Sequence, residues 1–330
     1  FRGDALIYAG RFEEAMGTAR GQYELAVRER STEAQAYFGL QLARPVSEHG
    51  DVRPAIQYAR AAAALFRDLG RPALLEPCLT DLVISLALSG QVGETVAALG
   101  ELDRLSLHRS YYAVEIPRAR AWAAIARGAL PEARGHLDAA VALGKRTGDL
   151  IGALDALHTI ARIGHPRRAL GAAVEIGKQV DGVLPAARVA HVKALTSRNV
   201  DDLVAVGATF EAMGAYLLAA EAATEAALAA HRRATPQRAA VLRRDAARLR
   251  RLCPDAVTPT LRTAPARAQL TPAEAEAAYL ATSGLSNREI AERLHRSVRT
   301  VEGQLQRCYE KLSITRRSEL GTALRDAPPD

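Results

Sequence analysis

At residues 270–320 the chain carries the sequence LTPAEAEAAYLATSGLSNREIAERLHRSVRTVEGQLQRCYEKLSITRRSEL, which is dense in helix start and stop signals. Thr271 stands before Pro272 and three residues before Glu274, which is the spacing of a capping box at a helix N-terminus. Gly284 suits the end of that helix, because glycine tolerates the left-handed conformation of a C-terminal cap. The spacing therefore predicts a helix that runs from Pro272 to Gly284.

Further helices and a tight turn follow in the same stretch. Ser286 and Glu289 form a second capping box, which opens a short helix. A turn at 295–296 leads to a third helix over 298–312, and a fourth helix is expected over about 316–324. Two short helices joined by a tight turn, the second exposing one face, form a helix-turn-helix. The expected inner faces consist of Ile290, Ala291, Leu294, Val301, Leu305, Cys308 and Leu312.

The stretch resembles the LuxR-type DNA-binding domain along its whole length. The matching positions are Leu270, Thr271, Glu274, Gly284, Leu285, Ser286, Asn287, Glu289, Ile290, Ala291, Leu294, Ser297, Thr300, Val301, Leu305, Tyr309, Lys311, Leu312 and Arg317. The family usually has Arg where Ala273 stands, His where Gln304 stands, and Lys or Glu at Glu302. A negative charge at Glu302 costs DNA affinity unless it accepts a hydrogen bond from a cytosine amino group. The specificity of other members therefore does not transfer to this chain.

The resemblance implies that the third helix enters the major groove of DNA. Glutamine can bind adenine through two hydrogen bonds and arginine can bind guanine in the same way. The free backbone amides at the start of the second helix can meet a phosphate. The alternatives are a solvated helix face and, for the serines, capping alone. The expected DNA-binding residues are Ser286, Asn287, Arg299, Thr300, Glu302, Gly303, Gln306, Arg307, Lys311 and Arg317.

The fourth helix is expected to supply a dimer seam through Leu320, Ala323 and Leu324, which recur at spacings of three and four residues. The resemblance implies this contact, and the alternative is that these side chains cover the core of their own domain. One recognition helix reads only a few base pairs, so specific binding favours two copies on a two-fold site. We therefore expect a weak homodimer that strengthens on double-stranded DNA.

Upstream of this domain a short pattern recurs in a chain that is 48% hydrophobic, 5% aromatic and rich in Ala and Leu. A glycine is followed five residues later by a small residue, with apolar or small residues four and seven positions further on. Each copy predicts a helical hairpin, and hairpins that stack to bury their apolar faces form a solenoid. The pattern resembles the tetratricopeptide repeat, and an irregular α-solenoid is the alternative. The copies begin at Gly10, Gly50, Gly90, Gly128, Gly164 and, after a longer gap, Gly214.

The predicted fold is all-α and has three parts. Residues 1–252 form the tetratricopeptide-like solenoid, 253–268 a Pro-rich linker, and 269–330 the LuxR-type domain. The net charge of +7 is compatible with a polyanionic partner. Residues 231–267 concentrate this charge, with ten arginines against two aspartates, although a solvated helix face is an equally simple explanation.

The sequence lacks the motifs that are typical of several function classes. The three cysteines form no CxxC pair, which argues against a zinc site or a disulfide framework and favours the reducing cytoplasm. The apolar stretch 82–93 is too short to span a bilayer, so we expect no membrane contact. No GxxxxGK[ST], HExxH or GxSxG motif occurs, so we expect neither a catalytic residue nor a cofactor or metal.

Repeats followed by a LuxR-type domain resemble the C-terminal half of the large ATP-binding LuxR regulators, including MalT-like proteins. Those proteins carry a nucleotide-binding module before the repeats. Because Phe1 lies within an expected helix, we expect this chain to be the C-terminal part of a longer protein.

The function expected from the sequence is sequence-specific DNA binding by a transcriptional regulator. The concave solenoid is expected to receive a small effector or a regulatory protein, and RNA polymerase is a further candidate partner. The alternative is a helical-repeat scaffold whose terminal domain mediates protein–protein contacts.

Overall fold

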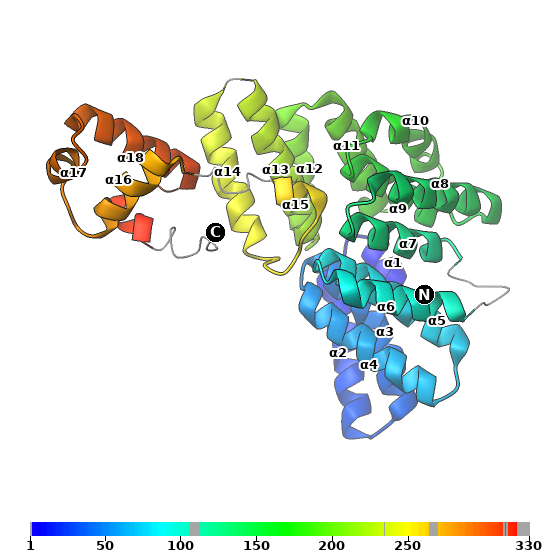
Figure 1. The fold of residues 1–330 in the computed structure, drawn as a ribbon. Coiled ribbons are helices and arrows are strands. Elements are labelled where there is room, and N and C mark those ends of the chain that lie inside the picture. The colour runs from blue at the N-terminus through cyan, green and yellow to red at the C-terminus, as the bar shows by residue number, and fades with distance from the viewer. Residues whose placement is uncertain are drawn as a thin grey trace.

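A computed structural model of the chain describes residues 2–105, 113–233, 235–263, 270–312, 314 and 316–321 (Figure 1). These ranges contain helices and no strands, so the all-α prediction is confirmed. The first part of the chain forms α1 (Arg2–Tyr8), α2 (Phe12–Arg28), α3 (Thr32–His49), α4 (Val52–Asp68), α5 (Pro72–Leu88), α6 (Val92–Arg104), α7 (Glu115–Ala126), α8 (Leu130–Thr147), α9 (Leu150–Arg162), α10 (Pro166–Gly177), α11 (Val183–Ser197), α12 (Val200–Ala212), α13 (Tyr216–Arg232), α14 (Pro236–Arg250) and α15 (Pro259–Thr263).

The repeated glycines lie in turns between consecutive helices, as the pattern predicts. All six have a positive φ, from 73° at Gly90 to 118° at Gly50, a conformation in which a side chain would be strained. The gap before Gly214 is longer because it holds three helices, α10 to α12, where each earlier gap holds two. The small residues that follow the glycines are all buried between helices: Ala15, Ala55, Thr95, Ala133, Ala169 and Ala219.

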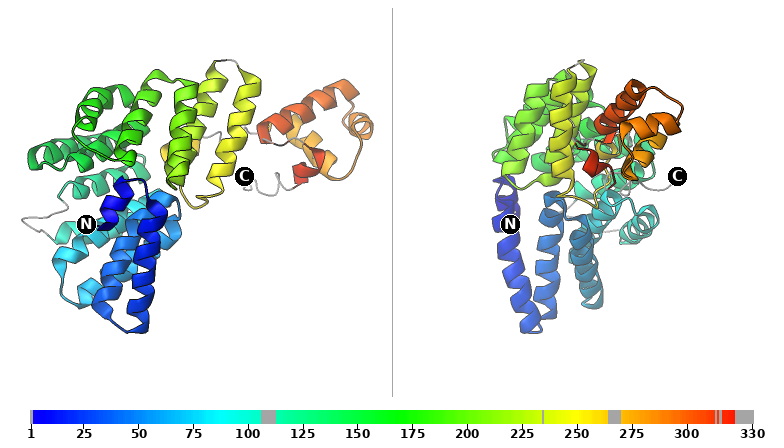
Figure 2. Two further views of the ribbon diagram at one scale, coloured as in Figure 1. Left: turned by 180° about the vertical axis from the view of Figure 1, so that it is seen from behind. Right: turned by 90° about the vertical axis from the view of Figure 1, so that its left-hand side faces the viewer.

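The solenoid coils until its first repeats touch its last ones (Figure 2). Helix α3 packs against α13, and α1 packs against α11. The amide of Val257 donates a hydrogen bond to the carbonyl of Leu88 at 2.5 Å. A Cβ atom on Gly50 would lie 2.8 Å from the Cβ of Cys253, so only glycine fits this junction. Repeats of an open solenoid contact only their neighbours, so this one is closed on itself.

The predicted linker is wrong for residues 253–263. Pro259 to Thr263 form the short helix α15, and three neighbouring side chains are buried in the solenoid core. Pro259 begins the helix, where its missing N–H leaves no hydrogen bond unmade. Residues 264–268 lie outside the described residues, so a linker there stays a prediction. The buried side chains are Cys253, Ala256 and Leu261.

The C-terminal domain has a separate apolar core. It contains α16 (Pro272–Thr282), α17 (Asn287–Arg293), α18 (Val298–Leu312) and the 3-10 turn η1 (Arg317–Glu319). Leu320 and Gly321 continue helically after η1, and residues 322–330 lie outside the described residues. The domain core consists of Ala277, Ala278, Ala281, Ile290, Ala291, Val301, Leu305, Cys308 and Leu320.

The expected dimer seam is contradicted at Leu320. This side chain is 0% exposed and packs inside its own domain, which is the alternative that the sequence left open. Ala323 and Leu324 lie outside the described residues. Within the residues that the structure describes, no helix is long and apolar enough to cross a membrane.

Candidate functional site

Both predicted capping boxes are present at the starts of α16 and α17. The Glu274 amide donates to the Thr271 hydroxyl at 3.3 Å, and the Thr271 amide donates to the Glu274 carboxylate at 2.8 Å. At the second box the Glu289 amide donates to the Ser286 hydroxyl at 3.3 Å, and the Ser286 amide donates to the Glu289 carboxylate at 2.6 Å. Ser286 therefore caps a helix, and a phosphate contact by it stays a prediction.

A tight turn separates α17 from α18, as the sequence predicts. His295 takes a left-handed φ of 50°, and the Arg296 amide donates back to the carbonyl of Ala291. Ser297 then caps α18, because its hydroxyl accepts a hydrogen bond from the Thr300 amide at 3.1 Å. The two helices and this turn have the arrangement of a helix-turn-helix.

Helix α18 has one buried and one exposed face. Its buried face carries Val301, Leu305 and Cys308, as expected from their spacing. Gln304 is also buried, and no partner of its Oε1 atom is found in the described structure. Five of the expected DNA-binding residues share the exposed face: Arg299, Thr300, Glu302, Gln306 and Arg307.

Gly303 lies among these exposed residues without a structural reason for being glycine. A Cβ atom there would meet only Nη1 of Arg307, at 3.6 Å, which is an ordinary contact. Glycine in a helix interior costs about 1 kcal/mol relative to alanine. The residue therefore keeps the backbone of the exposed face uncovered, which would allow another molecule to approach it closely.

Glu274 links α16 to α18, because its carboxylate binds two of the cations that were expected to contact DNA. It accepts a hydrogen bond from Nε of Arg307 at 3.1 Å and pairs with Nζ of Lys311. Burial alone would raise the pKa of the Glu274 carboxyl, but hydrogen bonds from Lys311, Thr271 and Arg307 lower it to about 2. Sequence reasoning assigned Glu274 to capping alone, and the structure adds this second role.

Arg317 and Asn287 also contact each other. The Nη1 atom of Arg317 donates to Oδ1 of Asn287 at 2.7 Å, and Nη2 donates to the carbonyl of Leu285. Arg317 thus closes the loop between α16 and α17. Two of the expected DNA-binding residues therefore hold the domain together.

The solenoid contains a buried ionic cluster around Asp155 on α9. Its Oδ2 atom lies 2.6 Å from Arg118, 3.3 Å from Arg44 and 3.4 Å from Arg188. These arginines come from α7, α3 and α11, and Glu48 on α3 binds two of them. Burial alone would raise the pKa of the Asp155 carboxyl, but Arg118, Arg188 and Arg44 lower it to about 2. The cluster joins helices that are more than one hundred residues apart.

A second buried group lies beside the first. Arg162 binds Glu221 through two hydrogen bonds of 2.6 and 3.0 Å and lies 5.0 Å from the Trp122 ring centroid. His158 and His191 share a hydrogen bond of 2.9 Å. Burial lowers the pKa of His191 to about 4 and the pKa of His158 well below its usual range, so both rings are neutral near pH 7.

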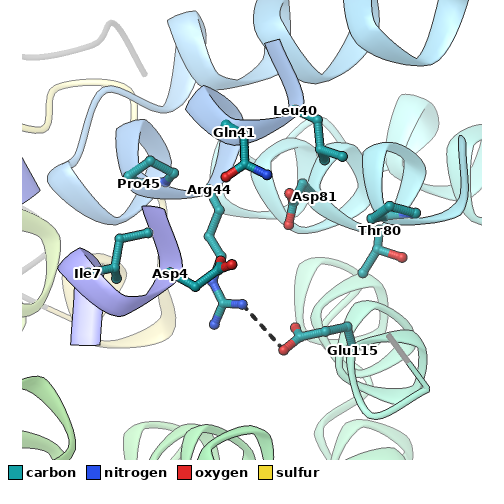
Figure 3. A pocket seen from close by; sticks show the side chains of 10 residues that line it. Asp4, Ile7, Leu40, Gln41, Arg44, Pro45, Thr80, Asp81 and Glu115 are labelled. Atoms are coloured by element: carbon teal, nitrogen blue, oxygen red, sulfur yellow. Dashed lines mark hydrogen bonds and ion pairs between the residues drawn. The ribbon is translucent and has the colours of Figure 1, made fainter. Parts of the chain in front are cut away.

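A cavity of about 60 Å³ opens between these groups. Arg118 and Arg188 line it, and the Nε atom of each is buried without a hydrogen-bond partner among the described residues. A neighbouring pocket, drawn in Figure 3, shares Arg44, Asp81 and Glu115 with it. Burial raises the pKa of the Asp81 carboxyl to about 7, and Arg44 opposes that shift. The two spaces therefore combine hydrogen-bond donors with a carboxyl group that is easily protonated.

The cluster was not predicted from the sequence, although a local signal for its acidic residues was present. Asp155 stands in the apolar run LIGALDALHTI and Glu221 in the alanine-rich run YLLAAEAATEAAL. An acidic residue in such an apolar run is often buried, and a buried carboxylate needs a cationic partner, although the second run also holds Glu225, whose side chain is 25% exposed. That rule identifies Asp155, but it does not choose between Glu221 and Glu225, nor does it identify arginines from distant repeats.

Comparisons with known proteins agree with this two-part description. Residues 268–323 match the GerE family model, described as "Bacterial regulatory proteins, luxR family". The fold of the chain is similar to that of a solved protein, described as "Crystal Structure of Rap Protein Complexed with Competence and Sporulation Factor". The TM-score is 0.61 and the identity 14%, over 77% of this chain and 74% of that one. At this identity the likeness establishes the helical-repeat fold alone. No curated protein matches the chain.

The family match coincides with the helices that carry both capping boxes, the tight turn and the exposed face of α18. Residues 268–323 therefore form a helix-turn-helix domain of the luxR family of bacterial regulatory proteins, and the preceding residues form a helical-repeat solenoid similar to that of Rap.

Proposed function

We propose that this chain is a DNA-binding transcriptional regulator whose α18 enters the major groove. The observation that carries the proposal is the exposed face of α18, where Arg299, Gln306 and an otherwise unexplained Gly303 lie together. Arginine and glutamine are the side chains that read guanine and adenine through paired hydrogen bonds. A glycine between them allows the helix backbone to approach the bases. The proposal assigns no catalytic step to this chain.

The solenoid is proposed to receive the regulatory input, either a small effector or a regulatory protein. Support comes from the unpartnered donors of Arg118 and Arg188 at the cavity among the described residues, and from the Rap structure, which is a complex with Competence and Sporulation Factor. The cavity holds only a few water molecules, so a larger effector would have to displace part of the ionic cluster. Kinship with the large ATP-binding LuxR regulators, a weak homodimer on DNA and a contact with RNA polymerase belong to the same proposal.

The first experiment tests DNA binding by the full chain. Fluorescence polarisation with a random-sequence duplex at low salt should show binding, and the C-terminal domain should contribute about −4 to the log–log salt slope if it neutralises about four phosphates. Selection from genomic fragments would then supply a preferred site. No binding to any duplex would favour the alternative, a scaffold whose terminal domain contacts proteins.

A recognition-helix variant tests the role of α18. On the selected site, Gln306→Ala should cost about 1–3 kcal/mol and relax the preference at one base pair. Arg288→Ala on α17 is the matched control, because its exposed partner is Glu292 on the same helix. Equal weakening of every sequence by Gln306→Ala would contradict the proposed reading of a base.

A ligand screen tests the regulatory input. Small carboxylates and short peptides would be added to the full chain, and both its melting temperature and its duplex affinity would be measured. A ligand of the solenoid should raise the first and change the second by linkage. The Asp81→Asn variant would be screened beside the wild-type chain. Asp81 suits this purpose because it lines both cavities and lies in no ion pair that the described structure shows.

A further inference from the structure

The charge of the chain is concentrated where the solenoid ends. Residues 231–267 carry ten arginines and two aspartates, a net charge of +8, whereas the whole chain carries +7. The remaining residues together therefore carry −1. Residues 270–321, which contain the helix-turn-helix, hold eight Lys or Arg against seven Asp or Glu. A nearly neutral DNA-binding domain is thus attached to a strongly basic neighbour.

Helix α14 presents part of this charge to solvent, while its Arg238 and Arg248 pair with Asp201 and Glu211 of α12. Its inner face packs Ala239, Ala246 and Leu249 into the solenoid core. Arg244 on α14 and Arg251, the C-cap of that helix, lie seven residues apart, about two helical turns, and both are exposed. Figures 1 and 2 show α14 as the solenoid helix nearest to the C-terminal domain.

Some exposed arginines elsewhere on the solenoid pair with carboxylates across the hairpins. Arg60 pairs with Glu94 and Arg67 with Glu101, each on the next hairpin along. Arg248 on α14 likewise pairs with Glu211 and with Asp245.

Arg244 and Arg251 differ from these paired arginines, as Arg20 and Arg28 on α2 also do, but only Arg244 and Arg251 lie in the basic segment 231–267. In the part of the chain that the structure describes, neither has a carboxylate partner. A polar outer face suits the last helix of a solenoid, but charges of mixed sign would serve that purpose equally well.

The covalent connection keeps this face near any DNA that α18 holds. Thr263 ends the packed part of the solenoid and Leu270 begins the C-terminal domain. Seven residue steps span at most about 25 Å, which is less than the roughly 34 Å of one duplex turn. A duplex in contact with α18 therefore passes within reach of the basic end of the solenoid.

We propose that the outer face of α14, centred on Arg244 and Arg251, binds the DNA phosphate backbone beside the site that α18 reads. The contact is independent of base sequence, because it uses exposed guanidinium groups and phosphate oxygens. It rests on the proposed function and adds to it. The solenoid thereby contributes affinity, while the helix-turn-helix contributes specificity.

The test compares two double variants of the full chain on a random-sequence 40-base-pair duplex between 50 and 200 mM salt, an experimental range of about one half decade. Arg244→Gln with Arg251→Gln should reduce the log–log salt slope by about 2 and weaken binding at 50 mM by about fivefold or more. Arg20→Gln with Arg28→Gln on α2 removes the same charge from exposed positions at the other end of the solenoid. This control should leave the slope and the affinity unchanged.

Further arms separate the possible outcomes. Arg244→Lys with Arg251→Lys keeps the charge and should restore most of the slope. An unchanged slope in the glutamine variant, or an equal loss in the α2 control, would overturn the proposal. If Arg299→Ala and Gln306→Ala leave binding intact while the α14 variant abolishes it, the α14 contact stands and the proposed role of α18 fails. Failure of the wild-type chain to bind the duplex at 50 mM salt would overturn both.

Discussion

Asp155 in the solenoid and Glu274 in the C-terminal domain are both carboxylates that hold several cations, but they differ in what they connect. Asp155 has a side chain that is 4% exposed and binds arginines from three distant helices. Glu274 binds two cations of one helix, and Arg307, the more open of them, has a side chain that is 55% exposed. The first carboxylate closes a solenoid, and the second fastens two helices of a small domain.

The difference shows which charges are committed to the fold. Removing one member of a buried ion pair leaves a charge that neither water nor another partner can stabilise. A cation that faces solvent can exchange its carboxylate for another anion at small cost. Arg307 and Lys311 are therefore available to phosphate in a way that Arg118 and Arg188 are not.

The largest expected effect is that of Asp155→Ala. The substitution leaves three guanidinium groups without their shared carboxylate, and should lower the free energy of unfolding by about 3–5 kcal/mol. Urea denaturation followed by circular dichroism measures it. Asp138→Ala is the control, because Asp138 pairs with Arg168 at the surface and should cost less than about 1 kcal/mol. Equal costs would show that the cluster is not what closes the solenoid.

Leu320→Ala should cost about 2–4 kcal/mol in the stability of the C-terminal domain, because the side chain is fully buried. A seam residue would instead weaken self-association and leave the domain stable. Thermal unfolding and sedimentation, measured on the same samples, distinguish the two. Tyr279→Ala serves as the comparison, since Tyr279 is 69% exposed on α16. A stable but monomeric Leu320→Ala variant would restore the dimer prediction.

Glu274→Gln should cost about 1–3 kcal/mol near pH 7, because it removes the charge that Lys311 and Arg307 contact. The folded-state pKa of Glu274 is lowered to about 2, so its contribution is present above its usual pKa and is lost as the pH falls toward 2. Wild type and variant should therefore converge in stability between about pH 5 and pH 2.

The same variant sharpens the DNA hypothesis. Glu274→Gln frees two cations on α18, so duplex affinity should rise although stability falls. Glu276→Gln removes an acidic residue of the same helix whose contact with Arg296 is long, at 3.8 Å, and should change neither quantity much. A loss of affinity in Glu274→Gln alone would mean that Arg307 and Lys311 must be held by Glu274 to bind DNA.

The sequence predicted those features whose causes are local. Thr271 with Glu274, and Ser286 with Glu289, are capping boxes whose partners lie three residues apart. The repeat glycines show their positive φ because a turn between two helices requires it. The bounds of α18 follow from Ser297 and from the spacing of its apolar residues.

Features that depend on contacts between distant parts of the chain could not be predicted in this way. The partners of Asp155 lie in repeats whose alignment depends on the superhelical closure of the solenoid. Residues 253–263 look like a linker from their prolines, but the surface that covers Cys253 and Leu261 exists only once the solenoid has closed. The roles of Arg317 and Asn287 were missed for a related reason, since their contact joins two ends of a small domain.

The smallest expected effect comes from Gly303→Ala, and it is the one that separates folding from binding most cleanly. Alanine fits without a clash and should raise the free energy of unfolding by up to about 1 kcal/mol. The same methyl group would stand between α18 and the bases, so affinity for the selected site should fall. Gly93→Ala on α6 is the matched control, since a Cβ atom there meets nothing within 4 Å and it should leave DNA binding unchanged. If Gly303→Ala stabilises the chain and binds DNA as well as wild type, the exposed face of α18 does not approach the bases closely. The orientation proposed for α18 in the groove would then have to be abandoned, whereas the phosphate contact proposed for α14 would be untouched.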